Sequence, residues 1–175
     1  MPSHLNVEIE ARCDDRDAVL QRLQRLGAVL QGVDRQVDTY FHAAIGRLKL
    51  RTGNIENSLI HYRREEHAGP KDSLVTLIET RSEDSAALRS VLAVALGIVV
   101  EVDKLRHILW IDNVKFHVDD VRGLGAFVEI EAIDRTGEIG RGSLLTQCEQ
   151  YLELLEIAEA AFKARSYSGL VLADA

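Results

Sequence analysis

The sequence predicts an α+β domain of 175 residues with about eight strands and about three helices. Two observations lead to this prediction. Charged and apolar residues alternate along most of the predicted strands, which gives each strand one charged and one apolar face. The predicted helices are amphipathic and need an apolar sheet surface to cover. The apolar strand faces supply that surface, which turns the charged faces inward. The alternative is an ordinary barrel or sandwich whose charged faces meet water.

Composition and charge limit the possible functions. A hydrophobic content of 46% and a charged content of 28% are ordinary for a globular domain. The formal net charge of −7 argues against a general nucleic-acid binder or a basic membrane-surface protein. The chain shows no signal-peptide pattern, and no apolar run approaches the ~18 residues of a membrane-spanning helix. The spacing of Cys13 and Cys148 suggests neither a metal site nor a disulfide framework, so we expect a reduced, cytoplasmic protein.

The first half of the chain is predicted to contain five strands and one helix. The strands cover residues 7–12, 29–41, 46–51, 59–65 and 73–81. Asp14 and Asp15 suit the start of the helix, and Gly27 is its stop signal. The polar loop around Gly69 and Pro70 is a candidate flap between the last two of these strands.

The second half adds two helices and three strands. Ser82 or Ser85 can cap a helix that carries an apolar stripe and ends at Gly97. The strands cover residues 99–109, 114–120 and 127–131. Apolar spacing marks a last helix over residues 144–155, and the tail after Arg165 is too short for an assignment. Because no linker or repeat divides the chain, we expect one domain over residues 1–175.

The charged strand faces form a pattern of their own. Their cations are Arg12, Lys49, Arg51, Arg63, Lys104, Arg106 and Lys115. Their anions are Glu8, Glu10, Asp119, Glu129 and Glu131. Seven cations against five anions leave +2 on these faces, while the whole chain carries −7. Clustered carboxylates suit Mg²⁺ or Mn²⁺, and dispersed Arg and Lys suit the oxygens of a polyphosphate. The competing interpretation is a set of surface salt-bridge ladders.

These residues resemble the CYTH superfamily, the triphosphate tunnel metalloenzymes, and especially its class IV adenylyl cyclase-like branch. The resemblance rests on motifs that occur in order from Val7 to about Leu172. The motifs are Glu8-x-Glu10-x-Arg12, Asp38-Thr39-Tyr40-Phe41, Gly46-Arg47-Leu48-Lys49-Leu50-Arg51, Lys104-x-Arg106, Lys115-Phe116-His117-Val118-Asp119, Gly123-Leu124-Gly125-x-Phe127-Val128-Glu129-Ile130-Glu131 and the terminal Ser166-Tyr167.

The resemblance implies a closed eight-stranded antiparallel β-barrel, with a charged interior and helices packed outside. It implies that Glu8, Glu10, Glu129 and Glu131 face a metal, and that Asp119 is a further catalytic or metal-proximal carboxylate. The side chains implied to grip the triphosphate are Lys49, Arg51, Arg63, Lys104 and Arg106, to which the charge pattern adds Arg12 and Lys115. Arg12 stands where the family signature has Lys. Because Arg stays charged and is a poor general base, this exchange weakens the expectation of efficient hydrolysis.

The function implied is that of a Mg²⁺- or Mn²⁺-dependent enzyme acting on a triphosphate. The first expectation is a class IV adenylyl cyclase-like reaction, in which ATP gives cyclic AMP and pyrophosphate. The alternative is hydrolysis of inorganic, thiamine or nucleoside triphosphate, and a further alternative is a non-catalytic nucleotide- or polyphosphate-binding module. The expected partner is a small-molecule triphosphate, not a nucleic acid or a membrane. The chain is expected to be a monomer or a homodimer.

We expect structural roles for one histidine, one tryptophan and two tyrosines. We expect His117 to be an interior polar partner of Asp119. Trp110 is interpreted as a packing residue, and Tyr40 and Tyr62 as residues packed under helices.

Overall fold

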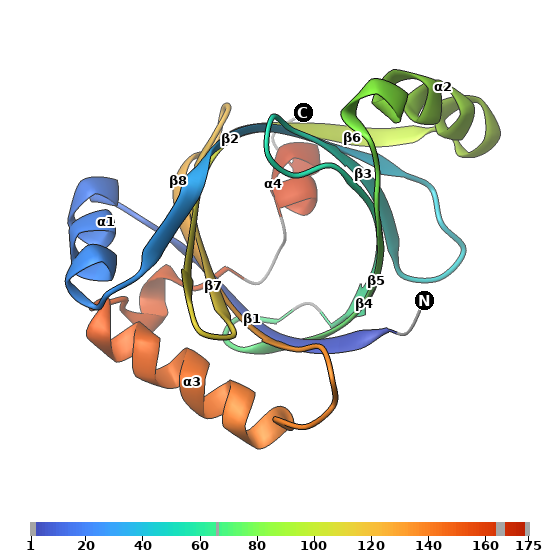
Figure 1. Ribbon diagram of the computed structural model, residues 1–175. Coiled ribbons are helices and arrows are strands. Elements are labelled where there is room, and N and C mark those ends of the chain that lie inside the picture. The colour runs from blue at the N-terminus through green and yellow to red at the C-terminus, as the bar shows by residue number, and fades with distance from the viewer. Residues whose placement is uncertain (1–2, 66, 164–166, 174–175) are drawn as a thin grey trace.

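The computed structural model describes residues 3–65, 67–163 and 167–173 and confirms the predicted barrel. The strands are β1 (His4–Arg12), β2 (Val29–Phe41), β3 (Arg47–Thr52), β4 (Ser58–Arg64), β5 (Lys71–Glu79), β6 (Ile98–Ile111), β7 (Val114–Val121) and β8 (Gly125–Asp134). Each is antiparallel to its neighbours in the order β1-β5-β4-β3-β2-β6-β7-β8, and β8 closes on β1. Figure 1 looks into the resulting ring of strands.

Three of the four described α-helices lie outside this ring (Figure 1). They are α1 (Arg16–Arg25), α2 (Ser85–Leu96) and α3 (Arg141–Leu154). The fourth helix, α4 (Tyr167–Ala173), was not predicted and lies within the outline of the ring in Figure 1. The expectation that the helices pack outside therefore holds for α1, α2 and α3 but not for α4. Within the described ranges, no helix is long and apolar enough to cross a membrane.

The helix ends follow the predicted local chemistry with one exception. Asp15 caps α1 by accepting the backbone N–H of Ala18 at 2.9 Å, and Gly27 follows the helix with a φ of 85°. Gly97 ends α2 with a φ of 76°. The start of α2 differs, because a 3-10 turn over Ser82–Asp84 precedes it and neither predicted serine caps it. A second 3-10 turn covers Glu159–Ala161.

The main apolar core lies outside the barrel, between the strands β1, β7 and β8 and the helices α1 and α3. Ile9, Phe116 and Ile130 on the outer strand faces pack in this core with Leu23 of α1 and with the α3 residues Leu144, Cys148 and Leu152. Burying an aliphatic or aromatic side chain of this size stabilises the fold by about 1.5–3 kcal/mol. The apolar faces are therefore directed outward under helices, which leaves the opposite faces of these strands to line the inside.

A second apolar cluster lies on the inner strand faces and includes Tyr167 of α4. Its members are Tyr40, Ile60, Tyr62, Val75, Val102, Val121, Phe127 and Tyr167. The backbone N–H of Lys163 donates to the carbonyl of Glu10 at 2.8 Å, so the segment that leads to α4 runs beside the end of β1. From there α4 places the ring of Tyr167 against Phe127, with 5.1 Å between the ring centroids. We call this the α4 end of the barrel.

Candidate functional site

A cavity of about 440 Å³ lies inside the barrel. Tyr167 borders it at the α4 end, and the exposed residues Gln31, Glu79 and Arg135 line it where it reaches the surface at the opposite end, which we call the mouth. Among the described residues, the lining includes seven Lys or Arg side chains and six Glu side chains. The cations are Lys49, Arg51, Arg64, Lys104, Arg106, Lys115 and Arg135. The glutamates are Glu8, Glu10, Glu56, Glu79, Glu129 and Glu131.

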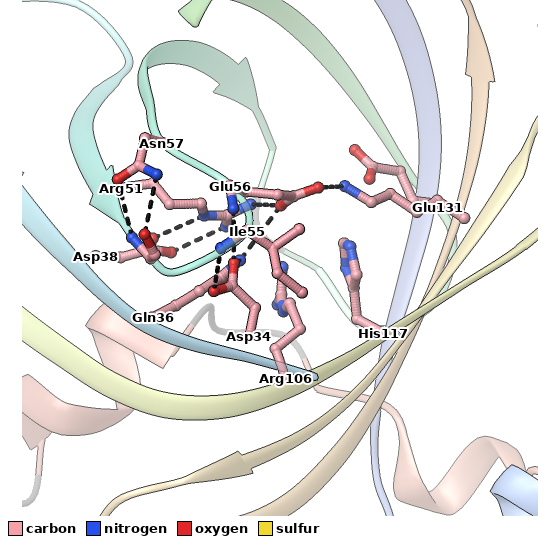
Figure 2. Close-up of polar contacts among 12 residues, drawn as sticks. Asp34, Gln36, Asp38, Arg51, Ile55, Glu56, Asn57, Arg106, His117 and Glu131 are labelled. Carbon is pink, nitrogen blue, oxygen red and sulfur yellow. Dashed lines mark hydrogen bonds and ion pairs between the residues drawn. The ribbon is translucent and has the colours of Figure 1, made fainter. Parts of the chain in front are cut away.

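Asp38 of β2 gathers three cations on the cavity wall, of which Figure 2 shows Arg51. Arg51 donates to both carboxylate oxygens, at 2.9 and 3.1 Å, while the Nζ atoms of Lys49 and Lys104 donate at 3.0 and 2.8 Å. Burial would raise the pKa of the Asp38 carboxyl, but these three cations hold it well below its usual range. Asp38 and Glu56 are two carboxylates that face the four cations Lys49, Arg51, Lys104 and Lys115, which leaves a local excess of positive charge that suits an anionic ligand.

The Lys104 amine is held in an unusual environment. Burial, with Arg106 close by, lowers its pKa to about 7, even though Asp38 favours the charged form. Its Nζ atom also lies 5.4 Å from the centre of the Tyr167 ring. An anion bound in the cavity would favour the protonated amine and raise this pKa.

Arg106 of β6 joins two carboxylates. It donates to both oxygens of Asp119, at 2.7 and 2.5 Å, and to Glu129 at 3.1 Å. Asp119 is fully buried and also accepts the hydroxyl of Tyr167 at 2.8 Å. This carboxylate therefore lies at the α4 end, where it fixes the guanidinium of Arg106 and ties α4 to the barrel.

Glu56 extends from the β3–β4 turn into the cavity (Figure 2). It accepts Arg51 at 3.1 Å, Gln36 at 3.3 Å and Lys115 of β7. Asp34 holds the turn by accepting the backbone N–H groups of residues 55 and 56, each at 2.9 Å. Although burial opposes ionisation, Lys115 and Arg51 keep the pKa of Glu56 below its usual range.

The two Glu-x-Glu pairs lie opposite each other across β1 and β8, as the closed barrel requires. Glu8 is paired with Glu131, and Glu10 with Glu129. Arg64 neutralises Glu8, and Asn6 donates to Glu131 at 2.5 Å. Glu129 accepts Arg106 and His117, but the buried Oε1 atom of Glu10 has no hydrogen-bond partner among the described residues.

Two of these four carboxyl groups resist ionisation. Burial, followed by the charge of Glu129, raises the pKa of Glu10 to about 8 and the pKa of Glu131 to about 7. A cation placed between the pairs would favour the ionised forms, and hard oxygen donors are what Mg²⁺ and Mn²⁺ prefer. No three His, Cys, Asp or Glu side chains converge as a ready cage in the described ranges. Mg²⁺ is nevertheless usually held by one or two carboxylates plus substrate phosphates, so the residues fit such an ion.

The structure corrects the predicted face of β4. Arg63 is exposed on the outside, whereas Arg64, Tyr62 and Ile60 line the cavity. The prediction directed charge inward everywhere, but on β4 the interior takes Tyr62 and Ile60, which pack in the second apolar cluster. The same parity brings Arg64 into the cavity, where it contacts Glu8. Arg64 therefore lies in the cavity, where Arg63 was expected.

Arg12 lies apart from the cavity lining. Its side chain is exposed at the α4 end, donates to the carbonyl of Leu124 at 2.9 Å and lies 5.1 Å from the centre of the Phe127 ring. The remaining cations that were expected inside, which are Lys49, Arg51, Lys104, Arg106 and Lys115, do line the cavity. Ser166, part of the terminal motif of the family resemblance, falls outside the described residues.

Several side chains play roles that sequence reasoning missed. Tyr40 and Tyr62 line the cavity rather than packing under helices, and Trp110, which was interpreted as a packing residue, lines it as well. His117 contacts Glu129, with 2.8 Å between Nδ1 and Oε2, and not Asp119. Asp38 was recognised only as part of a motif, and Asp34, Glu56, Arg64 and Lys71 were not assigned. The period-two spacing of Asp34, Gln36 and Asp38 on β2 is the signal that would have found this buried polar face.

The chain is similar to a known protein family and to a named relative. The family model described as CYTH domain matches residues 4–167. A protein of Methanocaldococcus jannaschii named "Putative adenylate cyclase" is 28% identical over 178 aligned positions, which cover 93% of this chain and 96% of the relative.

Two solved structures share the fold at lower identity. A protein of Vibrio parahaemolyticus, likewise described as a "putative adenylate cyclase", has a TM-score of 0.75 at 17% identity and covers 98% of this chain and 99% of its own. A "putative adenylyl cyclase" from Hippeastrum, described as revealing a dominant triphosphatase activity, has a TM-score of 0.61 at 14% identity and covers 95% and 94%.

Proposed function

The chain belongs to the CYTH domain family, and from this premise we propose that it is a divalent-metal-dependent enzyme that acts on a triphosphate held inside the barrel. One observation carries the proposal. The cations gathered by Asp38 and the Glu-x-Glu pairs of β1 and β8 line the same cavity. A polyphosphate can contact the first group while a bridging cation contacts the second.

The cations of the cavity bind and orient the triphosphate. Lys49, Arg51 and Lys104 share Asp38, and only Arg51 has a second carboxylate partner, Glu56, so part of their charge is available to phosphate oxygens. Arg106 is fixed in place by Asp119 from behind, which makes Asp119 a positioning carboxylate in this proposal. Lys115, held by Glu56, would contact the substrate nearer the mouth. Arg12 would stabilise the α4 end through Leu124 and Phe127 rather than touch phosphate.

The glutamates hold the metal. Glu10 and Glu131 are the first candidates, because their carboxyl groups have raised pKa values, while Glu8 and Glu129 complete the set from their ion pairs. When bound, Mg²⁺ or Mn²⁺ would neutralise phosphate charge and polarise the phosphoryl oxygens. The protein side chains orient the substrate, screen the remaining phosphate charge and keep the site within a confined cavity.

The reaction that we propose first is cyclisation of ATP. The ribose 3′-oxygen forms a bond to the α-phosphorus, the bond from that phosphorus to the bridging oxygen of the β-phosphate breaks, and pyrophosphate leaves. The hydroxyl proton is released to a base or to solvent. Support comes from the relative of M. jannaschii, whose name is that of an adenylate cyclase and whose similarity covers 93% of this chain.

Hydrolysis of a triphosphate is the second candidate. It is favoured by the structural neighbour from Hippeastrum, which is described as having a dominant triphosphatase activity. Both reactions use the same cations and carboxylates, because the triphosphate is the part of the substrate common to both. They differ in the nucleophile, which is a ribose hydroxyl in one case and water in the other.

One product-resolved assay tests the proposal. The protein is incubated with Mg²⁺ or Mn²⁺ and with ATP, inorganic triphosphate or thiamine triphosphate, and the products are separated. Cyclic AMP with pyrophosphate supports the cyclase, and orthophosphate release supports the triphosphatase. Tight triphosphate binding without turnover of any substrate would instead indicate a binding module. Absence of both binding and turnover would contradict the proposal as a whole.

A further inference from the structure

Glu56 brings a negative charge into the cavity from a turn rather than from a strand (Figure 2). Its Oε2 atom accepts Arg51 of β3 at 3.1 Å, and its Oε1 atom pairs with Lys115 of β7. In the order of the barrel, β2 and β6 separate β3 from β7, so this one carboxylate joins cations from distant parts of the wall. A carboxylate between two cations binds them as a phosphate group would.

The turn that carries Glu56 is itself held in place. Asp34 accepts the backbone N–H groups of residues 55 and 56, each at 2.9 Å. The side chain of Asn57 accepts the backbone N–H of Gly53 at 3.1 Å and donates to its carbonyl at 2.9 Å. Gly53 allows the close approach of Asp34, because a Cβ atom at this position would lie 2.6 Å from the carboxylate oxygens. Glu56 is therefore a fixed part of the cavity wall rather than part of an open loop.

Glu56 lies between two sections of the cavity that differ in chemistry. Along β2, Gln31 lies at the mouth, Gln36 contacts Glu56 at 3.3 Å, and Asp38 with the cations that it gathers lies beyond, on the α4 side. Among the described residues, the lining on the mouth side is mostly uncharged. Its members there are Gln31, Ile55, Trp110 and Ile133, with Glu79 and Arg135, of opposite charge, at the surface.

This arrangement separates a section that suits phosphate from one that does not. Phosphate groups need cations, which the α4 side supplies. The mouth side supplies apolar and neutral polar surface, and its cation Lys115 is already paired with Glu56. A phosphate group placed between Arg51 and Lys115 would lie against the Glu56 carboxylate, and the two like charges would repel each other.

Building on the proposed function, we propose that Glu56 limits the length of the phosphate chain that the cavity accepts. Its carboxylate takes the position that a further phosphate group would occupy between Arg51 and Lys115. The chain is confined to the cations on the α4 side, and only an uncharged part of the substrate continues toward the mouth. Because the proposed substrate is a triphosphate, the chains that Glu56 excludes are tetraphosphate and longer polyphosphates.

Binding of linear polyphosphates without metal tests this role free of turnover. Dissociation constants are measured in EDTA by calorimetry for inorganic triphosphate and tetraphosphate. We expect the unaltered protein to bind tetraphosphate no more tightly than triphosphate. Glutamine keeps the size of the side chain but not its charge, so Glu56→Gln frees Arg51 and Lys115 for an additional phosphate group. In this variant the affinity for tetraphosphate relative to triphosphate should rise by about 10-fold.

Glu149→Gln is the matched control, because it removes the same charge from an exposed position of α3. It should keep the relative affinities of the unaltered protein. Comparing the two anions within each protein separates the role of Glu56 from a general loss of repulsion, which would raise both affinities alike.

The unaltered protein supplies a readout that does not depend on a variant folding. Tighter binding of tetraphosphate than of triphosphate by this protein would overturn the inference, as would an unchanged ratio of the two affinities in Glu56→Gln. If the unaltered protein bound neither triphosphate nor ATP, the proposed function itself would fail.

Discussion

Replacing Glu10 by glutamine should stabilise the protein without ligand, and should do so only at high pH. Glu10 lies opposite Glu129 in the barrel wall, and within the described part of the chain its Oε1 atom has no hydrogen-bond partner. Burial, followed by the charge of Glu129, raises its pKa from 4.5 to about 8. A carboxyl whose pKa is raised by folding contributes stability that is fully present below pH 4.5 and is lost as the pH rises through about 8. Glutamine cannot ionise, so Glu10→Gln should not lose this contribution.

The size of the effect follows from how far folding raises the pKa of Glu10. A tenfold change in the acid dissociation constant corresponds to about 1.4 kcal/mol, so ionisation of this one carboxyl lowers the free energy of unfolding by on the order of 5 kcal/mol at pH 9. The unaltered protein and Glu10→Gln should be equally stable at pH 5, where both carry a neutral group. At pH 9 the variant should melt roughly 10 °C higher, since each kcal/mol changes Tm by about 2–4 °C in a domain of this size.

Thermal and urea unfolding in EDTA at pH 5, 7 and 9 measure this difference. Glu149→Gln, at an exposed position of α3, is the matched control and should leave the pH dependence unchanged. Metal-dependent turnover should be lost in Glu10→Gln although the variant is folded. Parallel stability profiles of the two proteins between pH 5 and 9 would refute the reasoning, because Glu10 would then be ionised in the folded protein at no cost.

Three further predictions concern other parts of the barrel. Arg64→Met should weaken triphosphate binding by about 10-fold and lower Tm, because Glu8 is left buried without its cation. Arg63→Met, on the outer face, should bind triphosphate like the unaltered protein. Equal binding by the two variants would contradict the corrected face of β4. Tyr167→Phe removes the hydroxyl that donates to the buried Asp119 and should lower the free energy of unfolding by about 1–2 kcal/mol. Urea denaturation measures this change. An unchanged midpoint would argue against α4 as the element that closes the barrel end. Binding of Mg²⁺ should release about one proton from Glu10 and Glu131 at pH 7 and almost none above pH 9, because both carboxyl groups have raised pKa values. Calorimetry in buffers of different ionisation enthalpy measures this release. A constant proton release across this pH range would contradict those pKa values.

Sequence reasoning predicted the carboxylate wall because it depends on local spacing and on closure of the barrel. Glu8 and Glu10 share a face of β1 through the period of two, and the same holds for Glu129 and Glu131 on β8. Once the first and last strands are neighbours, the two pairs must meet. The antiparallel register, Glu8 with Glu131 and Glu10 with Glu129, agrees with this expectation.

The predictions failed where a strand offers two plausible inner faces. On β4 the inner face contains Ile60, Tyr62 and Arg64, and the outer face contains His61 and Arg63, so charge alone does not choose between them. The choice depends on the second apolar cluster, which takes Tyr62 and Ile60 inside.

The helix α4 was missed for a related reason. It covers Tyr167–Ala173 and is too short to be stable or recognisable on its own. Contacts of Tyr167 with Phe127 and Asp119 hold it in place, and both partners lie far from it in the sequence.

The sequence alone determined which side chains share a strand face, how many strands and outer helices the domain has, and that carboxylates occur at both its first and last strands. Period-two spacing and helix-end signals are local, so one chain is enough to reveal them. The tertiary structure decided which face of β4 points inward, which cations Asp38 and Glu56 gather, and that α4 closes one end with Arg12 outside the cavity. These choices depend on packing and ion pairing between residues far apart in the chain, which the spacing within one strand does not reveal.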